Sequence, residues 1–138
     1  MNLAAGIGSS RDNEQLRILA VFHYVFAGLA LVGIGFLLLH YFFMRTMLSP
    51  EYMTGNPNPP PPEFLQMFVC FYIIFGALMI VGGVLNLIAG SSLRKHRARL
   101  FCMVVAGLNC LQFPFGTVLG VFTLVTLSRD SVRALFQD

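Results

Sequence analysis

Charged residues are scarce in this chain, and none of them interrupts its longest apolar runs. Only 11% of the 138 residues are Asp, Glu, Lys or Arg, whereas a soluble domain carries roughly 25%. Uncharged runs cover residues 18–44, 64–93 and 100–128. Since about 20 apolar residues in a helix cross the hydrocarbon core of a bilayer, each run is long enough to span once. The composition predicts an all-α integral membrane protein and disfavours an ordinary soluble domain.

The lack of charge inside these runs also restricts the function. Proton-coupled carriers and voltage sensors use ionisable groups within the membrane, so both classes are disfavoured. His23 and His40 remain, and they are 17 residues apart, which is roughly 25 Å along a helix and too far to share one metal or haem. Both lie among aromatic residues, which favours positions at the membrane interface. A haem or quinone site at either histidine stays open as an alternative.

Cysteine and the usual catalytic patterns are missing or sparse. Cys70, Cys102 and Cys110 form no CxxC pair and no zinc spacing, so we expect free buried thiols and no metal site. The patterns GxxxxGK[ST], HExxH and GxSxG are absent from the sequence, which leaves nucleotide binding and familiar hydrolase chemistry without support. We therefore expect no catalytic residue, no cofactor and no nucleic-acid partner.

The stretch NCLQFPFG, residues 109–116, decides how often the chain crosses the bilayer. As one helix, residues 100–128 would be about 43 Å long, whereas each arm of a hairpin would be short. Lys and Arg of short loops stay in the cytoplasm, and a hairpin leaves only Arg45 outside. Pro114 and Gly116 are typical of a helix break. These features predict a hairpin, and a re-entrant form of it stays open. Asn109 and Gln112 are expected at the interface.

The predicted organisation is a single membrane domain, residues 1–138, with four transmembrane segments and both termini in the cytoplasm. The segments are residues 17–44, 64–91, 97–112 and 114–128, joined by an outer proline-rich loop, 45–63, and a basic cytoplasmic loop, 92–99. Four consecutive prolines in the outer loop favour a stiff spacer. No apolar signal core precedes the first segment, so we expect a multi-pass protein of the cell inner membrane.

Small residues predict where the helices pack, because in lipid they permit close approach of two backbones. The expected packing residues are Gly28, Gly35, Gly76, Gly83, Gly90, Asn86, Gly116 and Gly120. The first five glycines follow sevenfold spacing within their helices, so we expect the first two spans to meet along them. Asn86 lies on nearly the same face, where it would hydrogen-bond across that interface or to a partner subunit. Gly116 and Gly120 form a GxxxG pattern, which suits a hairpin contact or oligomerisation.

Basic residues gather near the predicted cytoplasmic surface. The candidates for contact with anionic lipid headgroups are Arg94, Lys95, Arg97, Arg99, Arg129 and Arg133. Such attraction contributes about 1 kcal/mol per well-placed residue. The tail that follows the last segment predicts a short amphipathic turn, with Val132, Leu135 and Phe136 toward lipid.

The C-terminal third carries a recognisable pattern. It reads Pro114-x-Gly116-Thr117-x-Leu119-Gly120-x-x-Thr123-Leu124, followed by Val132-Arg133-x-Leu135-Phe136. This tail resembles one shared by small, functionally uncharacterised bacterial multi-pass membrane proteins. The resemblance implies a bacterial four-segment membrane protein and brings no active site or ligand. Asp130 stands where such tails often have Pro.

Taken together, these features favour a non-enzymatic protein that acts through helix packing. Its partners would be the lipid bilayer and either further copies of itself, as a homo-oligomer, or other membrane subunits, as an accessory subunit of a larger complex. One alternative is a small oligomeric channel or carrier, because pores can be built from carbonyls and hydroxyls. Its polar path would be lined by Asn86, Thr117, Thr123 and Thr126.

Overall fold

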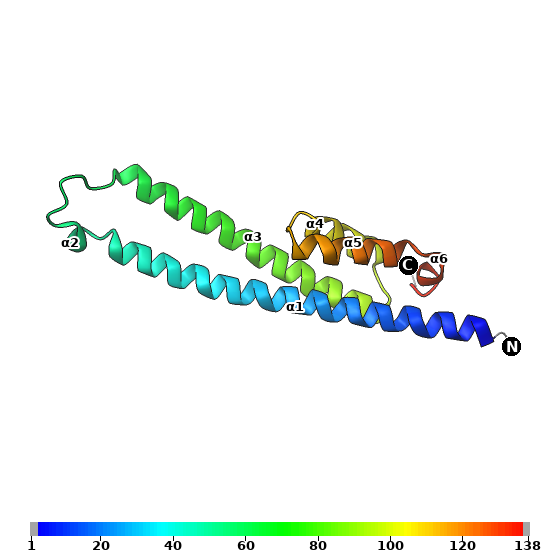
Figure 1. The fold of residues 1–138 in the computed structure, drawn as a ribbon. Coiled ribbons are helices and arrows are strands. Elements are labelled where there is room, and N and C mark those ends of the chain that lie inside the picture. Colours follow the sequence, from blue (N-terminus) through cyan, green and yellow to red (C-terminus); the bar gives the residue numbers. More distant parts are fainter. Residues whose placement is uncertain (1–2, 137–138) are drawn as a thin grey trace. The chain divides into compact units, whose positions relative to one another are not determined.

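The computed structural model describes residues 3–136, and within that range every regular element is a helix (Figure 1). The helices are α1 (Leu3–Met47), α2 (Pro50–Met53), α3 (Pro62–Lys95), α4 (Arg99–Asn109), α5 (Phe115–Ser128) and α6 (Asp130–Arg133). The predicted all-α class is confirmed. Two of the helices, α1 and α3, are long and apolar enough to cross a membrane. At 1.5 Å per residue they are about 68 and 51 Å long, well above the roughly 30 Å hydrocarbon thickness.

Both long helices extend beyond their predicted ends. α1 begins at Leu3 instead of residue 17, because the polar N-terminal stretch contains no proline and several good helix formers that continue the apolar helix. α3 ends at Lys95 instead of residue 91, so Arg94 and Lys95 occupy its last turn, where cations complement the helix dipole. The basic loop predicted over 92–99 therefore shrinks to residues 96–98.

The helix break lies within the stretch that predicted it. α4 ends at Asn109 and α5 begins at Phe115, after a cis Phe113–Pro114 peptide. The two helices lie side by side as a hairpin (Figure 1). They are about 16 and 21 Å long, shorter than the predicted segments 97–112 and 114–128. The two helices approach closely at Gly120, because this residue has no Cβ. A Cβ at that position would collide with the Ala106 carbonyl oxygen.

The outer loop predicted over residues 45–63 is shorter and partly helical. α1 continues to Met47, and the four residues of α2 follow after a short turn. The last of the four consecutive prolines, Pro62, is the first residue of α3, a position where the missing amide donor costs no hydrogen bond. The irregular connection is thereby reduced to residues 54–61.

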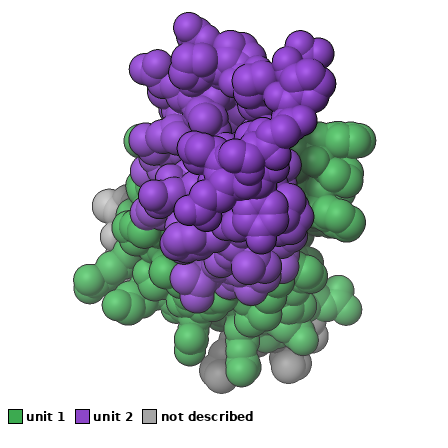
Figure 2. Space-filling view, turned by 90° about the vertical axis from the view of Figure 1, so that its left-hand side faces the viewer, with its two compact units in different colours: residues 1–27, 84–138 green, residues 28–83 purple. Residues whose placement is uncertain are grey.

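The chain packs as two compact units, where the sequence predicts a single domain (Figure 2). Unit 1 comprises residues 1–27 and 84–138, and unit 2 comprises residues 28–83, so α1 and α3 each contribute to both. The core of unit 1 consists of Leu16, Leu19, Ala20, Leu93, Cys102, Leu119, Leu127, Val132 and Phe136. The prediction that Val132 and Phe136 face lipid is therefore wrong. Arg129 adopts an extended conformation that ends α5, and the tail after it packs into this core.

In unit 2, the face of α1 that contacts α3 is one that the glycine pattern did not select, whereas Gly76 of α3 lies at the contact as predicted. A Cβ on Gly33 would lie 2.9 Å from Met79 Sδ, and one on Gly76 would lie 3.5 Å from Leu37 Cδ2. In contrast, a Cβ on Gly28 or Gly35 would meet no atom within 4 Å among the described residues. Two residues turn a helix by about 200°, so Gly35 points nearly opposite to Gly33. The predicted packing of the first two helices along Gly28 and Gly35 is therefore wrong within this chain.

Candidate functional site

Four helices of unit 1 each supply one buried polar side chain to a single cluster. These residues are His23 from α1, Asn86 from α3, Asn109 from α4 and Thr123 from α5. Their exposed fractions are 0%, 3%, 1% and 0%, respectively. We call these four residues the polar cluster. It is the site in unit 1 where chemistry-bearing groups from distant parts of the sequence meet.

Each member of the polar cluster occupies one position on a buried helix face. The buried residues recur at intervals of three and four, as in Leu16, Leu19, Ala20, His23 and Ala27 of α1, in Cys102, Val105, Ala106 and Asn109 of α4, and in Gly116, Leu119, Gly120 and Thr123 of α5. This spacing places them on one face of each helix. Alanine and glycine neighbours let the helices approach closely enough for short polar side chains to reach one another.

Two carboxamides form the centre of the polar cluster. Asn86 Nδ2 donates to Asn109 Oδ1 at 3.1 Å, and Asn109 Nδ2 donates to Asn86 Oδ1 at 2.8 Å. His23 Nδ1 lies 2.7 Å from the same Asn86 oxygen. Because a carboxamide oxygen only accepts, His23 Nδ1 carries a proton and donates it. Asn86 Oδ1 thus accepts two hydrogen bonds, one for each of its lone pairs.

The other ring nitrogen of His23 faces α5. Nε2 lies 3.4 Å from Thr123 Oγ1, and that hydroxyl also donates to the Leu119 carbonyl oxygen at 2.8 Å. The hydroxyl has one proton for these two acceptors, so the shorter bond to Leu119 is the stronger one. His23 is therefore enclosed by Asn86 on one side and Thr123 on the other.

The arrangement stabilises the packing of helices. In a low-dielectric interior, hydrogen bonds are strong when made and costly when lost, so the polar cluster ties four helices together. Nowhere in residues 3–136 do three or more His, Cys, Asp or Glu side chains gather as they would around a metal ion. A ligand on His23 Nε2 would have to displace Thr123.

The structure corrects two predicted surface positions in unit 1. His23 was expected at the membrane interface, and Asn109 in contact with water or headgroups, but both are buried in the polar cluster. The reason is that each falls on the apolar face of its helix and finds a hydrogen-bonding partner there. Gln112 is exposed. The three-and-four spacing that ends at Asn109 is a signal that would have placed this residue inside.

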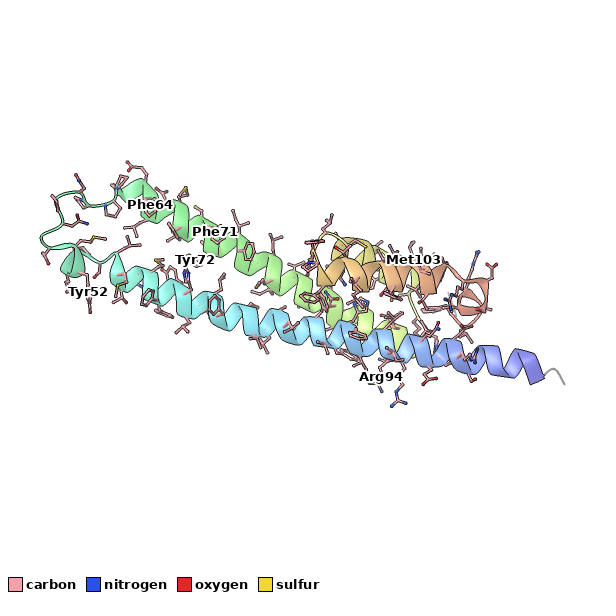
Figure 3. The ribbon with its side chains drawn as sticks, viewed as in Figure 1. Tyr52, Phe64, Phe71, Tyr72, Arg94 and Met103 are labelled. Carbon is pink, nitrogen blue, oxygen red and sulfur yellow. The ribbon has the colours of Figure 1, made fainter. Side chains whose placement is uncertain are left out.

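The second histidine belongs to unit 2. His40 Nδ1 and the Tyr72 hydroxyl share a hydrogen bond of 2.5 Å, and Tyr72 lies on the side of α3 that faces α1 within this unit (Figure 3). The Tyr72 ring also makes an edge contact with Tyr41, with centroids 5.4 Å apart. This aromatic arrangement fixes the orientation of the Tyr72 hydroxyl.

Two of the basic candidates make hydrogen bonds inside unit 1. The Arg99 guanidinium donates from Nε and Nη2 to the Leu127 carbonyl oxygen, at 2.9 and 2.6 Å. Arg99 therefore caps the end of α5, where carbonyl groups lack helical partners, and its contact with lipid headgroups stays a prediction. Arg129 Nη1 donates to Gln15 Oε1 at 3.0 Å. The side chains of Arg94, Lys95, Arg97 and Arg133 are exposed.

The small residues of unit 1 lie at close approaches. A Cβ on Gly90 would be 2.9 Å from Tyr24 Cε1, and one on Gly116 would be 2.5 Å from the Asn109 carbonyl oxygen. Gly83 is buried. At the hairpin turn, Thr117 Oγ1 donates to the Cys110 carbonyl oxygen at 2.8 Å, so this hydroxyl, a candidate lining residue in the channel alternative, forms a bond within the hairpin.

The three cysteines are free, as predicted, but only Cys102 is fully buried. Cys110 is half-buried, and Cys70 is exposed on the surface of α3, so the expectation of three buried thiols is wrong for Cys70.

The chain matches no protein-family model, no curated protein and no solved structure. The resemblance of its tail to bacterial multi-pass proteins therefore stays a prediction.

Proposed function

We propose that this chain is a non-enzymatic protein of the bacterial inner membrane that acts through helix packing, as a homo-oligomer or as an accessory subunit of a larger membrane complex. The observation that carries the proposal is the apolar surface that the chain leaves uncovered. In the most apolar stretches of α1 and α3, only 11% and 6% of residues are buried inside the chain. A surface of this kind requires lipid or another membrane protein against it.

The proposed topology has two crossings and a re-entrant hairpin. α4 and α5 are about 16 and 21 Å long, less than the roughly 30 Å of hydrocarbon, so we place their hairpin in the membrane without crossing it. Their backbone groups are bonded within the helices, as the bilayer demands. Arg45 is the only one of nine basic residues that belongs to unit 2. The positive-inside rule therefore favours both termini in the cytoplasm.

The outward face of α1 in unit 2 supports self-association. Gly28 and Gly35 leave a smooth strip there, flanked by Leu31, Val32 and Leu39, whose side chains are 71%, 69% and 69% exposed. A second helix can approach such a strip closely and bury the flanking side chains. The same face on two copies would form a symmetric contact, which is why we place the homo-oligomer before the accessory subunit.

The test is native mass spectrometry of the protein extracted gently from its own membrane. Gly35→Leu fills the strip and should weaken association about 5- to 150-fold, since inserting extra methylenes into a packed contact costs about 1–3 kcal/mol. The matched control is Ala77→Leu, which enlarges an exposed residue of α3 in the same unit. Complexes of identical chains that only Gly35→Leu disrupts support the homo-oligomer. Stoichiometric complexes with other polypeptides support the accessory subunit. A monomer in mild detergents that crosslinks to nothing in membranes refutes the proposal.

A further inference from the structure

A cavity of about 560 Å³ lies in unit 2, where the end of α1, the turn after it and the first half of α3 meet. Its apolar wall includes Leu65, Phe68 and Val69 of α3. Its polar groups come from Arg45 and Ser49, together with Tyr72. The volume falls in the range of about 300–1,000 Å³ that small-molecule sites occupy in proteins. The lining thus combines apolar side chains that suit an acyl chain with polar groups that suit a polar head.

The charge of the cavity comes from Arg45. This residue is the only Lys or Arg among residues 28–83. Among residues 3–136, no side chain or carbonyl group makes a hydrogen bond or ion pair with its guanidinium. Glu51 and Glu63, the two carboxylates of the unit, are both exposed and do not pair with it. The five N–H groups of the guanidinium are therefore available to an anion.

The wall beside Arg45 is held in place before any ligand arrives. The Tyr72 hydroxyl is hydrogen-bonded to His40, and the Tyr72 ring packs edge-on against Tyr41, which also lines the cavity. The Phe68 ring lies beside Tyr72, with centroids 6.3 Å apart. A wall that is already ordered loses little entropy when a ligand binds. Aromatic side chains of this kind concentrate where membrane helices reach the headgroups.

We propose that this cavity binds one anionic phospholipid. Arg45 pairs with the phosphate, because a guanidinium matches phosphate geometry with two parallel hydrogen bonds. Ser49 donates a further hydrogen bond, and one acyl chain lies along Leu65, Phe68 and Val69. The inference rests on the proposed membrane location, since only a chain embedded in a bilayer meets such a ligand at this depth. It goes further by assigning a specific class of lipid to a cavity of unit 2.

The experiment compares lipid retention by four full-length proteins. Wild type, Arg45→Gln and the control Arg11→Gln are placed in nanodiscs of phosphatidylcholine with a minority of phosphatidylglycerol, and native mass spectrometry counts the lipids that stay bound. Arg11 is exposed and lies outside the cavity. Arg11→Gln should retain as much phosphatidylglycerol as wild type. Arg45→Gln should bind it about tenfold more weakly, the loss expected for hydrogen bonds to a charged group, and Arg45→Lys should recover only part of that.

The outcomes separate the lipid site from the membrane proposal. If wild type inserts but Arg45→Gln retains phosphatidylglycerol equally well, the lipid site is refuted and the membrane location stands. If inorganic phosphate displaces the lipid from detergent-solubilised wild type at equal concentration, the site recognises free phosphate and the lipid assignment fails. If wild type does not enter nanodiscs at all, the membrane proposal fails and the lipid site falls with it.

Discussion

Replacing Asn109 by leucine tests whether the polar cluster ties the helices of unit 1 together. Asn109 makes two hydrogen bonds to Asn86, at 3.1 and 2.8 Å, and is 1% exposed. Leucine has the same branched shape, although it is larger, so the substitution removes the bonds while the site stays filled. It leaves Asn86 without one acceptor and one donor in the interior.

The expected cost follows from these two bonds. A buried hydrogen bond contributes about 0.5–1.5 kcal/mol net, so losing both costs about 1–3 kcal/mol. That range corresponds to a roughly 5- to 150-fold increase in the fraction of molecules in which unit 1 is open. Asn86→Leu should cost more than Asn109→Leu, because it also removes the acceptor of the His23 Nδ1 proton.

The opening can be read from the reactivity of a single thiol. Cys102 on α4 is fully buried, whereas Cys70 is exposed and Cys110 is half-buried. In a background with alanine at Cys70 and Cys110, a maleimide reaches Cys102 only when unit 1 opens. When reclosing is faster than labelling, the rate is proportional to the open fraction. Asn109→Leu should therefore be labelled about 5- to 150-fold faster than the background.

The matched control is Gln112→Leu, which removes an exposed carboxamide from the same hairpin and should leave the labelling rate at the background value. Equal rates for Asn109→Leu and Gln112→Leu would show that the polar cluster does not stabilise unit 1. A slower rate for Asn86→Leu than for Asn109→Leu would contradict the assignment of His23 as a donor to Asn86.

Two further substitutions examine contacts of the hairpin. Gly120→Ala brings a Cβ against the Ala106 carbonyl oxygen and should lower the free energy of unfolding in detergent by about 1–3 kcal/mol. In the control Gly107→Ala, the new Cβ meets no atom within 4 Å among the described residues, so the free energy of unfolding should rise by up to about 1 kcal/mol. Equal stability of the two variants would refute the close approach. Arg99→Gln removes both bonds to the Leu127 carbonyl oxygen and should speed amide hydrogen exchange in the last turn of α5, with Arg99→Lys recovering only part of the protection. Unchanged exchange in Arg99→Gln would rule out the cap.

The sequence predicted those features that depend on neighbouring residues along the chain. The break between α4 and α5 follows from Pro114, which has no amide donor, and the long helices follow from uninterrupted apolar runs. The helix ends were less predictable. α1 extends back to Leu3 because helix formation propagates cheaply once begun, and local composition does not mark where propagation stops.

The orientation of each helix was decided by the tertiary structure. The sevenfold spacing of Gly28 and Gly35 correctly places them on one face, but in unit 2 the neighbouring helix contacts the opposite face, at Gly33. Lipid is as apolar as a protein core, so hydrophobicity does not tell which face of a membrane helix is covered. Packing shape makes that choice, and it depends on residues far away in the sequence.

The polar cluster shows the same division. The sequence alone determined that Asn86 would stand as a lone polar group in an apolar helix and would require a hydrogen-bonding partner. Only the tertiary structure decided that the partners are His23 and Asn109, 63 and 23 residues away. A carboxamide can form its hydrogen bonds with water, with a headgroup or with another side chain, and the sequence does not indicate which of these partners it has. The tertiary structure decides the partner because it brings the side chains of His23, Asn86 and Asn109 within hydrogen-bonding distance and buries them away from water.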